Sequence, residues 1–265
     1  MNLNLTGKTV IVTGGGSVIG RGISLGFARE GATVVIAEID EAQGAKTAAD
    51  AERAGAKAAV SLRADVTRWE DVQGLVREVE QRFGGVDVLV NNVGWVREGL
   101  FVEKTREEWE REVQLNLWSV INCSRAVLDG MIARRAGAIV SISSDAGRVG
   151  EFREAVYGAC KAGVMALTKT LAREVGRHGI RANVVCPGTT MPDSDEEVGS
   201  SSMWRSEELR SWNTPEMRTK IGKLYPLRRI GRAEDIAPTV VFLASDAASF
   251  ITGQTVSVSG GYTMM

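Results

Sequence analysis

The stretch TGGGSVIG, residues Thr13–Gly20, decides how this chain folds. It follows the short apolar run KTVIVTG (8–14), which is typical of a buried strand, and it opens the segment 18–32, in which apolar residues recur at helical spacing. A glycine-rich turn at this place points backbone N–H groups and the positive end of a helix at one spot, which suits a phosphate. It is not a P-loop, because no Lys-Ser/Thr pair ends it. Taken alone, the turn indicates a phosphate site or a simple tight turn equally well.

The alternation of strand and helix continues to the end of the chain. Six further apolar runs read as strands, at 33–39, 57–66, 86–92, 136–144, 180–188 and 253–261, and helical patterns lie between them. Thr67 with Glu70, and Thr105 with Glu108, have the spacing of capping boxes at the starts of two helices, the second reaching 135. Residues 155–178 form another long helical pattern. Because continuous apolar strands alternate with helices, we predict an α/β fold: a single doubly wound Rossmann domain over 1–265, with a seven-stranded parallel sheet and helices on both faces.

Composition excludes several classes of function. A formal net charge of −1 offers no pull toward nucleic acid or anionic lipid, so neither is an expected partner. A single histidine and three widely spaced cysteines rule out metal-ligand patterns, and we predict no metal site. We also expect no signal peptide and no membrane span, and free thiols in a cytoplasmic protein.

Glu38 strengthens the dinucleotide interpretation. It ends the second apolar run, roughly 20 residues beyond the glycines, where an acid can accept hydrogen bonds from adenosine ribose hydroxyls and repel a 2′-phosphate. No basic residue stands at 15–17 to bind that phosphate. The pattern therefore favours NAD over NADP, although a solvated acid at a helix start is the alternative.

The segment YGACK, Tyr157–Lys161, carries the clearest chemistry. The two residues are four apart on a predicted helix and share a face, so the ammonium is expected to stabilise the phenolate and lower its pKa. Such a tyrosine can exchange a proton with an alcohol or ketone. Ser143 and Ser144 end the fifth predicted strand, and Asn116 lies in a long helix.

Seven segments in this order resemble the classical short-chain dehydrogenase/reductases over essentially the whole chain. They are TGGGSVIG (13–20), ADV (64–66), NNVG (91–94), LN (115–116), SISS (141–144), YGACK (157–161) and CPG (186–188). In wording they are most similar to the branch of 2-hydroxycyclohexanecarboxyl-CoA dehydrogenase and, more loosely, to 3-oxoacyl-carrier-protein reductases.

The resemblance implies roles for individual residues. Tyr157 would be the general acid/base, Lys161 would tune it and bind the nicotinamide ribose, Ser144 would bind the substrate oxygen, and Asn116 would support a water-mediated proton path. The cofactor-binding residues would be Gly14, Ser17, Val18, Ile19, Gly20, Glu38, Asp65, Val66, Asn92, Gly94, Tyr157, Lys161, Pro187, Gly188 and Thr190.

Two positions depart from the family pattern. Val18 stands where the family usually has glycine, and a valine is expected to avoid positive φ. Pro192 stands where a threonine commonly contacts the nicotinamide amide, a role that Thr189 or Thr190 could take over. These departures keep open an alternative: a non-catalytic dinucleotide-binding scaffold subunit.

The expected activity is hydride transfer between NAD and a small secondary alcohol or ketone, and the resemblance suggests a cyclic compound or a β-hydroxy acyl thioester. Residues 188–228 are too long for a simple connection, so we interpret them as a substrate lid, with a solvated insertion as the alternative. The residues expected to line the mouth and the lid are Trp95, Arg97, Arg148, Phe152, Arg153, Met203, Trp204 and Trp212. The resemblance also implies a homotetramer built on the two long helices at about 105–135 and 155–178.

Overall fold

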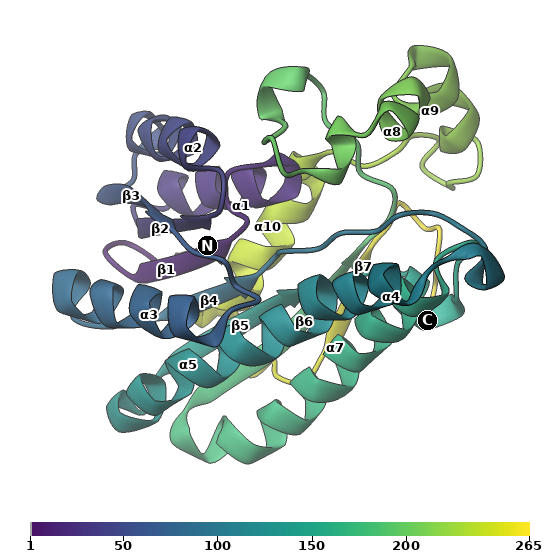
Figure 1. The fold of residues 1–265 in the computed structure, drawn as a ribbon. Helices are drawn as coiled ribbons and strands as arrows, with labels where there is room; N and C mark the ends of the chain where they lie inside the picture. Colours follow the sequence, from purple (N-terminus) through teal and green to yellow (C-terminus); the bar gives the residue numbers. More distant parts are fainter. Residues whose placement is uncertain (1) are drawn as a thin grey trace.

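A computed structural model describes residues 2–265 and shows one sheet covered by helices on both faces (Figure 1). The strands are β1 (Thr9–Thr13), β2 (Thr33–Glu38), β3 (Ala58–Arg63), β4 (Val88–Asn91), β5 (Gly137–Ile142), β6 (Ile180–Pro187) and β7 (Thr255–Val258). All six pairings are parallel, and the order is β3-β2-β1-β4-β5-β6-β7. The predicted fold class is confirmed. The order reverses between β1 and β4, the place where open α/β sheets bind ligands.

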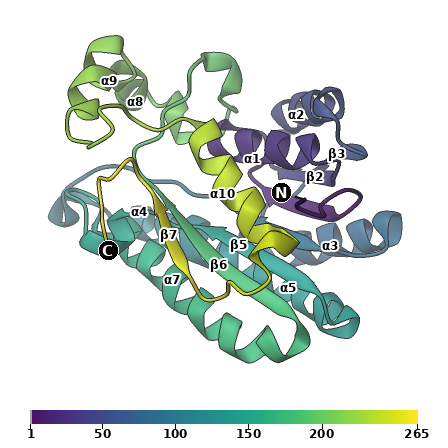
Figure 2. The same ribbon diagram turned by 180° about the vertical axis from the view of Figure 1, so that it is seen from behind.

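Two apolar layers hold the helices on the sheet. On one face lie α1 (Val18–Arg29), α2 (Glu41–Ala54) and α10 (Ala233–Ala244), and on the other α3 (Trp69–Phe83), α5 (Ser119–Arg134) and α7 (Ala155–Val175). Figure 2 shows α10 in front of the sheet, seen from behind. Alternate β1 residues serve the two layers, since Val10 and Val12 belong to the first and Ile11 to the second.

The helix predicted over 105–135 is divided by a π-helical turn. It consists of α4 (Arg106–Val113), the π-turn Gln114–Trp118 and α5. The Thr105–Glu108 capping box is confirmed, because the Thr105 hydroxyl accepts from the Glu108 N–H and the Glu108 carboxylate accepts from the Thr105 N–H. The box predicted at Thr67 and Glu70 is wrong, because the Thr67 hydroxyl donates to Asp65 and α3 begins at Trp69.

Residues 188–228 leave the carboxyl end of β6 and carry only short helices. These are single 3₁₀ turns at Asp195–Glu197 and Met203–Arg205, then α8 (Glu207–Trp212) and α9 (Pro215–Gly222). A short helix, α6 (Ala146–Val149), connects β5 toward α7. None of the helices formed by residues 2–265 is long and apolar enough to cross a membrane.

Candidate active site

The glycine-rich turn between β1 and α1 has a backbone shape that requires glycine. Gly14 has a φ of +59°, and a Cβ at Gly20 would lie 2.0 Å from the Gly14 carbonyl oxygen. The Gly14 N–H donates to the Ala37 carbonyl at 2.8 Å and ties the turn to β2. The result is a concave backbone at the N-terminus of α1, beside Ile19, and a cradle that any Cβ would fill suits a pyrophosphate.

Val18 adopts a left-handed conformation. Its φ is +42°, so the prediction of a negative φ is wrong. The turn needs a left-handed residue here to bring the chain from Ser17 into α1, and a β-branched residue in that conformation is strained. The Val18 side chain is only 8% exposed, and its burial offsets the strain.

Glu38 lies at the end of β2 against this turn. Its Oε2 accepts from the Gly16 N–H at 3.1 Å and its Oε1 from the Ile39 N–H at 2.9 Å. Burial raises the pKa of the Glu38 carboxyl, and the backbone hydrogen bonds oppose that rise. An acceptor is thus held at the place where ribose hydroxyls are bound in dinucleotide folds.

Gln43 and Thr47 of α2 also bind the glycine-rich turn, and the sequence analysis did not identify them. The Gln43 amide donates to the Gly16 carbonyl at 2.9 Å, and the Thr47 hydroxyl donates to the same oxygen at 3.2 Å. The sequence signal was weak, because polar residues in the first two turns of a helix usually face solvent.

Thr13 and Asn92 join the ends of β1 and β4 at the switch point. The Asn92 N–H donates to the Thr13 hydroxyl at 3.0 Å, and its amide donates to the Thr13 and Gly14 carbonyls at 3.0 and 3.2 Å. Gly94 follows, and a Cβ there would lie 3.1 Å from Lys161 Nζ. The predicted Asn92 therefore stands beside the turn, and the predicted Gly94 stands beside Lys161.

Asp65 and Val66 lie beyond β3, on the far side of the turn. Asp65 Oδ1 accepts from the Thr67 N–H at 3.0 Å, and the Val66 carbonyl accepts from the Asn122 amide at 3.2 Å. These bonds fix the loop at the carboxyl end of β3. The family resemblance implies that the adenine of the cofactor binds at this loop.

Tyr157 and Lys161 lie one turn apart on α7, as predicted. Lys161 Nζ is 5.5 Å from the centre of the Tyr157 ring and donates to the Ile142 carbonyl at 3.0 Å. The lysine side chain is buried, and burial lowers its pKa to about 8.

The predicted lowering of the Tyr157 pKa is wrong for this structure. Burial raises the pKa of the phenol, and the neighbouring Glu154 carboxylate raises it further, while a hydrogen bond with Ser144 lowers it. The Lys161 ammonium lies against the ring rather than at the hydroxyl, so it does not offset the burial.

Ser143 and Ser144 end β5 facing this helix. The Ser143 hydroxyl donates to the Lys161 carbonyl at 2.8 Å and joins strand to helix. The Ser144 hydroxyl accepts from the Ala146 N–H at 3.1 Å, and its interaction with the Tyr157 phenol lowers the pKa of that group. Ser144 is therefore the serine on the Tyr157 side, as predicted.

Asn116 sits in the π-helical turn with its side chain fully buried. Its Oδ1 accepts from the Trp95 N–H at 3.0 Å, and its Nδ2 donates to the Trp95 and Glu112 carbonyls at 2.7 and 2.8 Å. Glu112 is itself buried and forms an ion pair with the buried Lys104. Asn116 thus fixes the loop after β4 beside Tyr157.

The residues predicted to line the mouth divide into two groups. Phe152 is 74% exposed, and Trp95 has the Arg111 guanidinium over its ring, 4.2 Å from the centroid. Arg148 does not belong to the rim: it donates to the Thr255 and Met265 carbonyls at 2.5 and 3.0 Å, so it anchors the C-terminal segment. Glu154 lies just before α7. Its burial, together with the charges of Glu98 and Glu151, raises the pKa of its carboxyl group to about 7.

The residues after β6 form the last wall. Pro187 and Gly188 end the strand, and the Tyr225 hydroxyl accepts from the Thr189 N–H at 2.9 Å. The Thr190 hydroxyl donates to the Gly188 carbonyl at 3.1 Å. Because Thr190 is buried and engaged in this bond, Thr189 is better placed to replace the threonine that Pro192 displaces.

The residues predicted for the site lie just beyond the carboxyl ends of strands β1 to β6, in the first turn of α1, in the π-helical turn and on α7. Among the described residues 2–265, no group of His, Cys, Asp and Glu could hold a metal ion. A cradle for a pyrophosphate, an acid for a ribose and a tyrosine beside a serine define a dinucleotide-dependent oxidoreductase.

Comparison with known proteins agrees with this class. A family model described as "Enoyl-(Acyl carrier protein) reductase" matches residues 14–263. The 3-oxoacyl-[acyl-carrier-protein] reductase FabG of Chlamydia muridarum is 39% identical over 262 residues, which are 98% of this chain and 99% of that protein. The protein of the same name from Staphylococcus aureus strain N315 is 38% identical over 257 residues, covering 97% and 98%.

A solved structure, the crystal structure of gox2181, matches with a TM-score of 0.87 and 34% identity, over 98% of this chain and 97% of that one. The chain belongs to the short-chain dehydrogenase/reductase family. It is an oxidoreductase, and the cofactor of this family is a nicotinamide dinucleotide.

Proposed function

We propose that this protein is an NAD-dependent dehydrogenase that interconverts a secondary alcohol and a ketone. The observation that carries the proposal is the grouping of Tyr157, Lys161 and Ser144 beside the glycine-rich turn. A scaffold subunit that only bound a dinucleotide would have no chemical need for these three side chains.

Each residue has a part that its position supports. Ser144 donates a hydrogen bond to the substrate oxygen, and Tyr157 gives that oxygen a proton or removes one, according to the direction of reaction. Lys161 and Gly94 flank the nicotinamide ribose, and the turn 14–20 holds the pyrophosphate. Asn116 keeps the loop at Trp95 in place and supports the path by which the proton is replaced. The bound dinucleotide supplies the hydride.

Glu38 is the basis for preferring NAD. A 2′-phosphate next to this carboxylate would add like-charge repulsion in a partly dehydrated pocket. Asp65 and Val66 would complete the adenine end of the site.

The substrate class rests on the rim and on the relatives. The name of the relatives describes reductases of a 3-oxoacyl thioester, and Phe152 and Trp212, two of the apolar residues expected at the mouth and the lid, are exposed. We infer a small apolar ketone, cyclic or with a thioester β to the carbonyl, covered by the lid 188–228 of this single domain.

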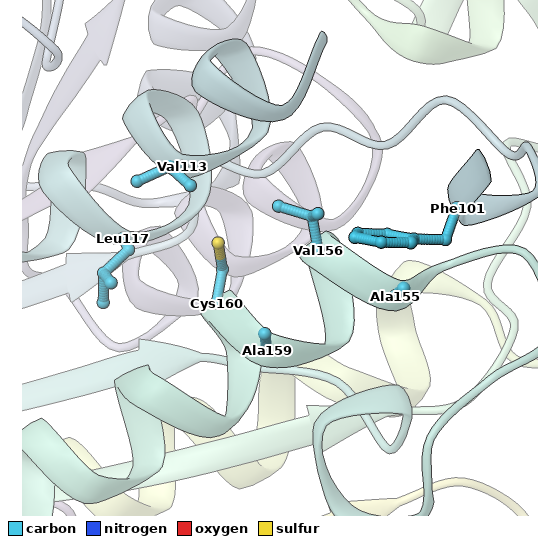
Figure 3. A pocket seen from close by; sticks show the side chains of 7 residues that line it. All are labelled: Phe101, Val113, Leu117, Ala155, Val156, Ala159 and Cys160. Carbon is cyan, nitrogen blue, oxygen red and sulfur yellow. The ribbon is translucent and has the colours of Figure 1, made fainter. Parts of the chain in front are cut away.

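A homotetramer in the cytoplasm is part of the same proposal. Figure 3 shows an apolar pocket of about 340 Å³ between α7 and the helix that contains the π-turn. It is lined by Phe101, Val113, Leu117, Ala155, Val156, Ala159 and Cys160. Such a surface on two long helices suits a helix pair of a second copy.

The test is a titration with NADH and with NADPH, followed by a substrate panel. Acetoacetyl-CoA, ethyl 2-oxocyclohexanecarboxylate and cyclohexanone are compared at saturating cofactor. We expect a higher kcat/KM with NADH than with NADPH and turnover of at least one β-keto compound. Failure to bind either dinucleotide at millimolar concentration would overturn the enzyme proposal, whereas binding without turnover of any ketone or alcohol would favour the scaffold.

A further inference from the structure

One part of the lid lies far from the substrate side of the site. We call residues 194–202 the clasp; in Figure 1 they belong to the green arch that rises beside α1 and α2. The Ser17 hydroxyl donates to the Glu197 carbonyl and accepts from the Gly199 N–H, both at 3.2 Å. The clasp is therefore bound directly to the glycine-rich turn.

The β2–α2 connection provides a second anchor. Asp40 Oδ2 accepts from the Ser200 N–H at 2.6 Å, and this bond lowers the pKa of Asp40. The Gln43 amide, which donates to the Gly16 carbonyl, also lies 3.3 Å from the Glu196 carbonyl, and Lys46 Nζ donates to that carbonyl at 3.1 Å. The backbone of the clasp is thus held by the side chains of Ser17, Asp40, Gln43 and Lys46.

These anchors lie on both sides of Glu38. Ser17 precedes α1 on one side of the carboxylate, Asp40 follows it on the other, and Gln43 joins the turn to the clasp. Glu38 is only 8% exposed. The clasp therefore bridges the turn and the β2–α2 connection, the two segments that flank this carboxylate.

The Ser17 hydroxyl has no competing duty in its own helix. Ser17 is the N-cap residue of α1, yet its side chain forms no capping hydrogen bond. In most helices a serine at this position satisfies a free N–H of the first turn. Here the hydroxyl serves the clasp, which leaves the first N–H groups of α1 for an anion.

We propose that the clasp is the gate of the adenosine half of the cofactor site: it detaches from Ser17, Asp40 and Lys46 to admit the dinucleotide and closes again over the adenosine ribose. This inference rests on the proposed function and assigns the first part of the lid to cofactor exchange rather than to substrate. Opening of the clasp therefore limits both association and dissociation of NAD(H).

A reversible crosslink tests the gate. Asp40→Cys/Ser200→Cys places two thiols on residues that the bond from the Ser200 N–H to Asp40 Oδ2 already joins, and closure of the disulfide is verified by mass and thiol titration. With the clasp locked, we expect NADH association in stopped-flow fluorescence to slow by at least a hundredfold. NADH bound before oxidation should dissociate equally slowly, and a reductant should restore both rates. Oxidised Asp40→Cys alone is the matched control for the lost carboxylate and for the native thiols.

A second measurement does not depend on the crosslink. Lys46→Met removes one anchor without touching the turn or Glu38, and it should raise the NADH association and dissociation rates together, severalfold, with little change in Kd. Arg53→Met, on the same helix but paired with Asp50, should leave both rates unchanged. NADH should also slow amide hydrogen exchange of the peptide 194–202.

The outcomes separate the two proposals. If the locked protein binds NADH as fast as the reduced protein, or if Lys46→Met changes neither rate, the clasp is no gate while the cofactor assignment stands. If the reduced protein binds neither NADH nor NADPH, the cofactor assignment fails, and the gate fails with it.

Discussion

The strained residue Val18 offers the sharpest quantitative test of how the turn is built. At an ordinary buried helical position, Gly in place of Ala lowers the free energy of unfolding by about 1 kcal/mol through helix propensity. It loses about 0.8 kcal/mol more with the buried methyl group, which makes roughly 2 kcal/mol together. At Val18 the left-handed φ of +42° acts in the opposite direction, because it destabilises Ala by about 1–2 kcal/mol and does not destabilise Gly. The two contributions largely cancel, so we expect the free energies of unfolding of Val18→Gly and Val18→Ala to differ by at most about 1 kcal/mol.

Urea denaturation followed by circular dichroism, at one protein concentration, measures this difference. The matched control is Ala28→Gly in the same helix, where the side chain is fully buried, and it should cost about 2 kcal/mol. If Val18→Gly is less stable than Val18→Ala by as much as that control, Val18 is an ordinary helical residue and the argument from positive φ is refuted. Because the Val18 side chain is buried, Val18→Ala should also keep the NADH Kd within about threefold of wild type.

Three further changes test the site. Tyr157→Phe should lower kcat by about 10²–10⁴ while calorimetry shows an unchanged NADH Kd, and near-normal turnover would disprove its acid/base role. Glu38→Ser combined with Ile39→Arg should raise kcat/KM with NADPH relative to NADH; an unchanged ratio would remove Glu38 from cofactor choice. Glu154 has a folded-state pKa of about 7, raised from 4.5, so its contribution to stability is present below pH 4.5 and is lost as pH rises through 7. Glu154→Gln should therefore be more stable than wild type at pH 8, by up to about 3 kcal/mol in urea unfolding, and a stability gain that is the same at pH 5 and pH 8 would contradict this origin.

A second tyrosine gives the control for the loss of a phenol. The Tyr262 hydroxyl donates to Glu151 at 2.9 Å, and the ring stacks on Tyr225 rather than lying beside Lys161. Tyr262→Phe should keep the turnover that Tyr157→Phe loses.

Local pattern alone determined most of the architecture. Continuous apolar runs alternating with helical periodicity require a parallel sheet with two covered faces, and the sheet observed has the seven predicted strands. Part of the site followed from the same pattern, because Glu38 and Ser144 lie at the ends of predicted strands and Tyr157 lies on an adjoining helix. The place of Asn92 beside the cofactor came from the family resemblance.

What the sequence could not indicate depends on contacts between distant segments. The positive φ of Val18 occurs in a turn that is hydrogen-bonded to Glu38 and to the Ala37 carbonyl of β2. The raised pKa of Tyr157 follows from burial and from Glu154, and the role of Arg148 from a C-terminal segment more than a hundred residues away. The clasp is the extreme case, since Ser17 and Gly199 are 182 positions apart. Periodicity and spacing report only neighbours along the chain, whereas these effects arise when the folded chain brings remote backbone and charge into one dehydrated space.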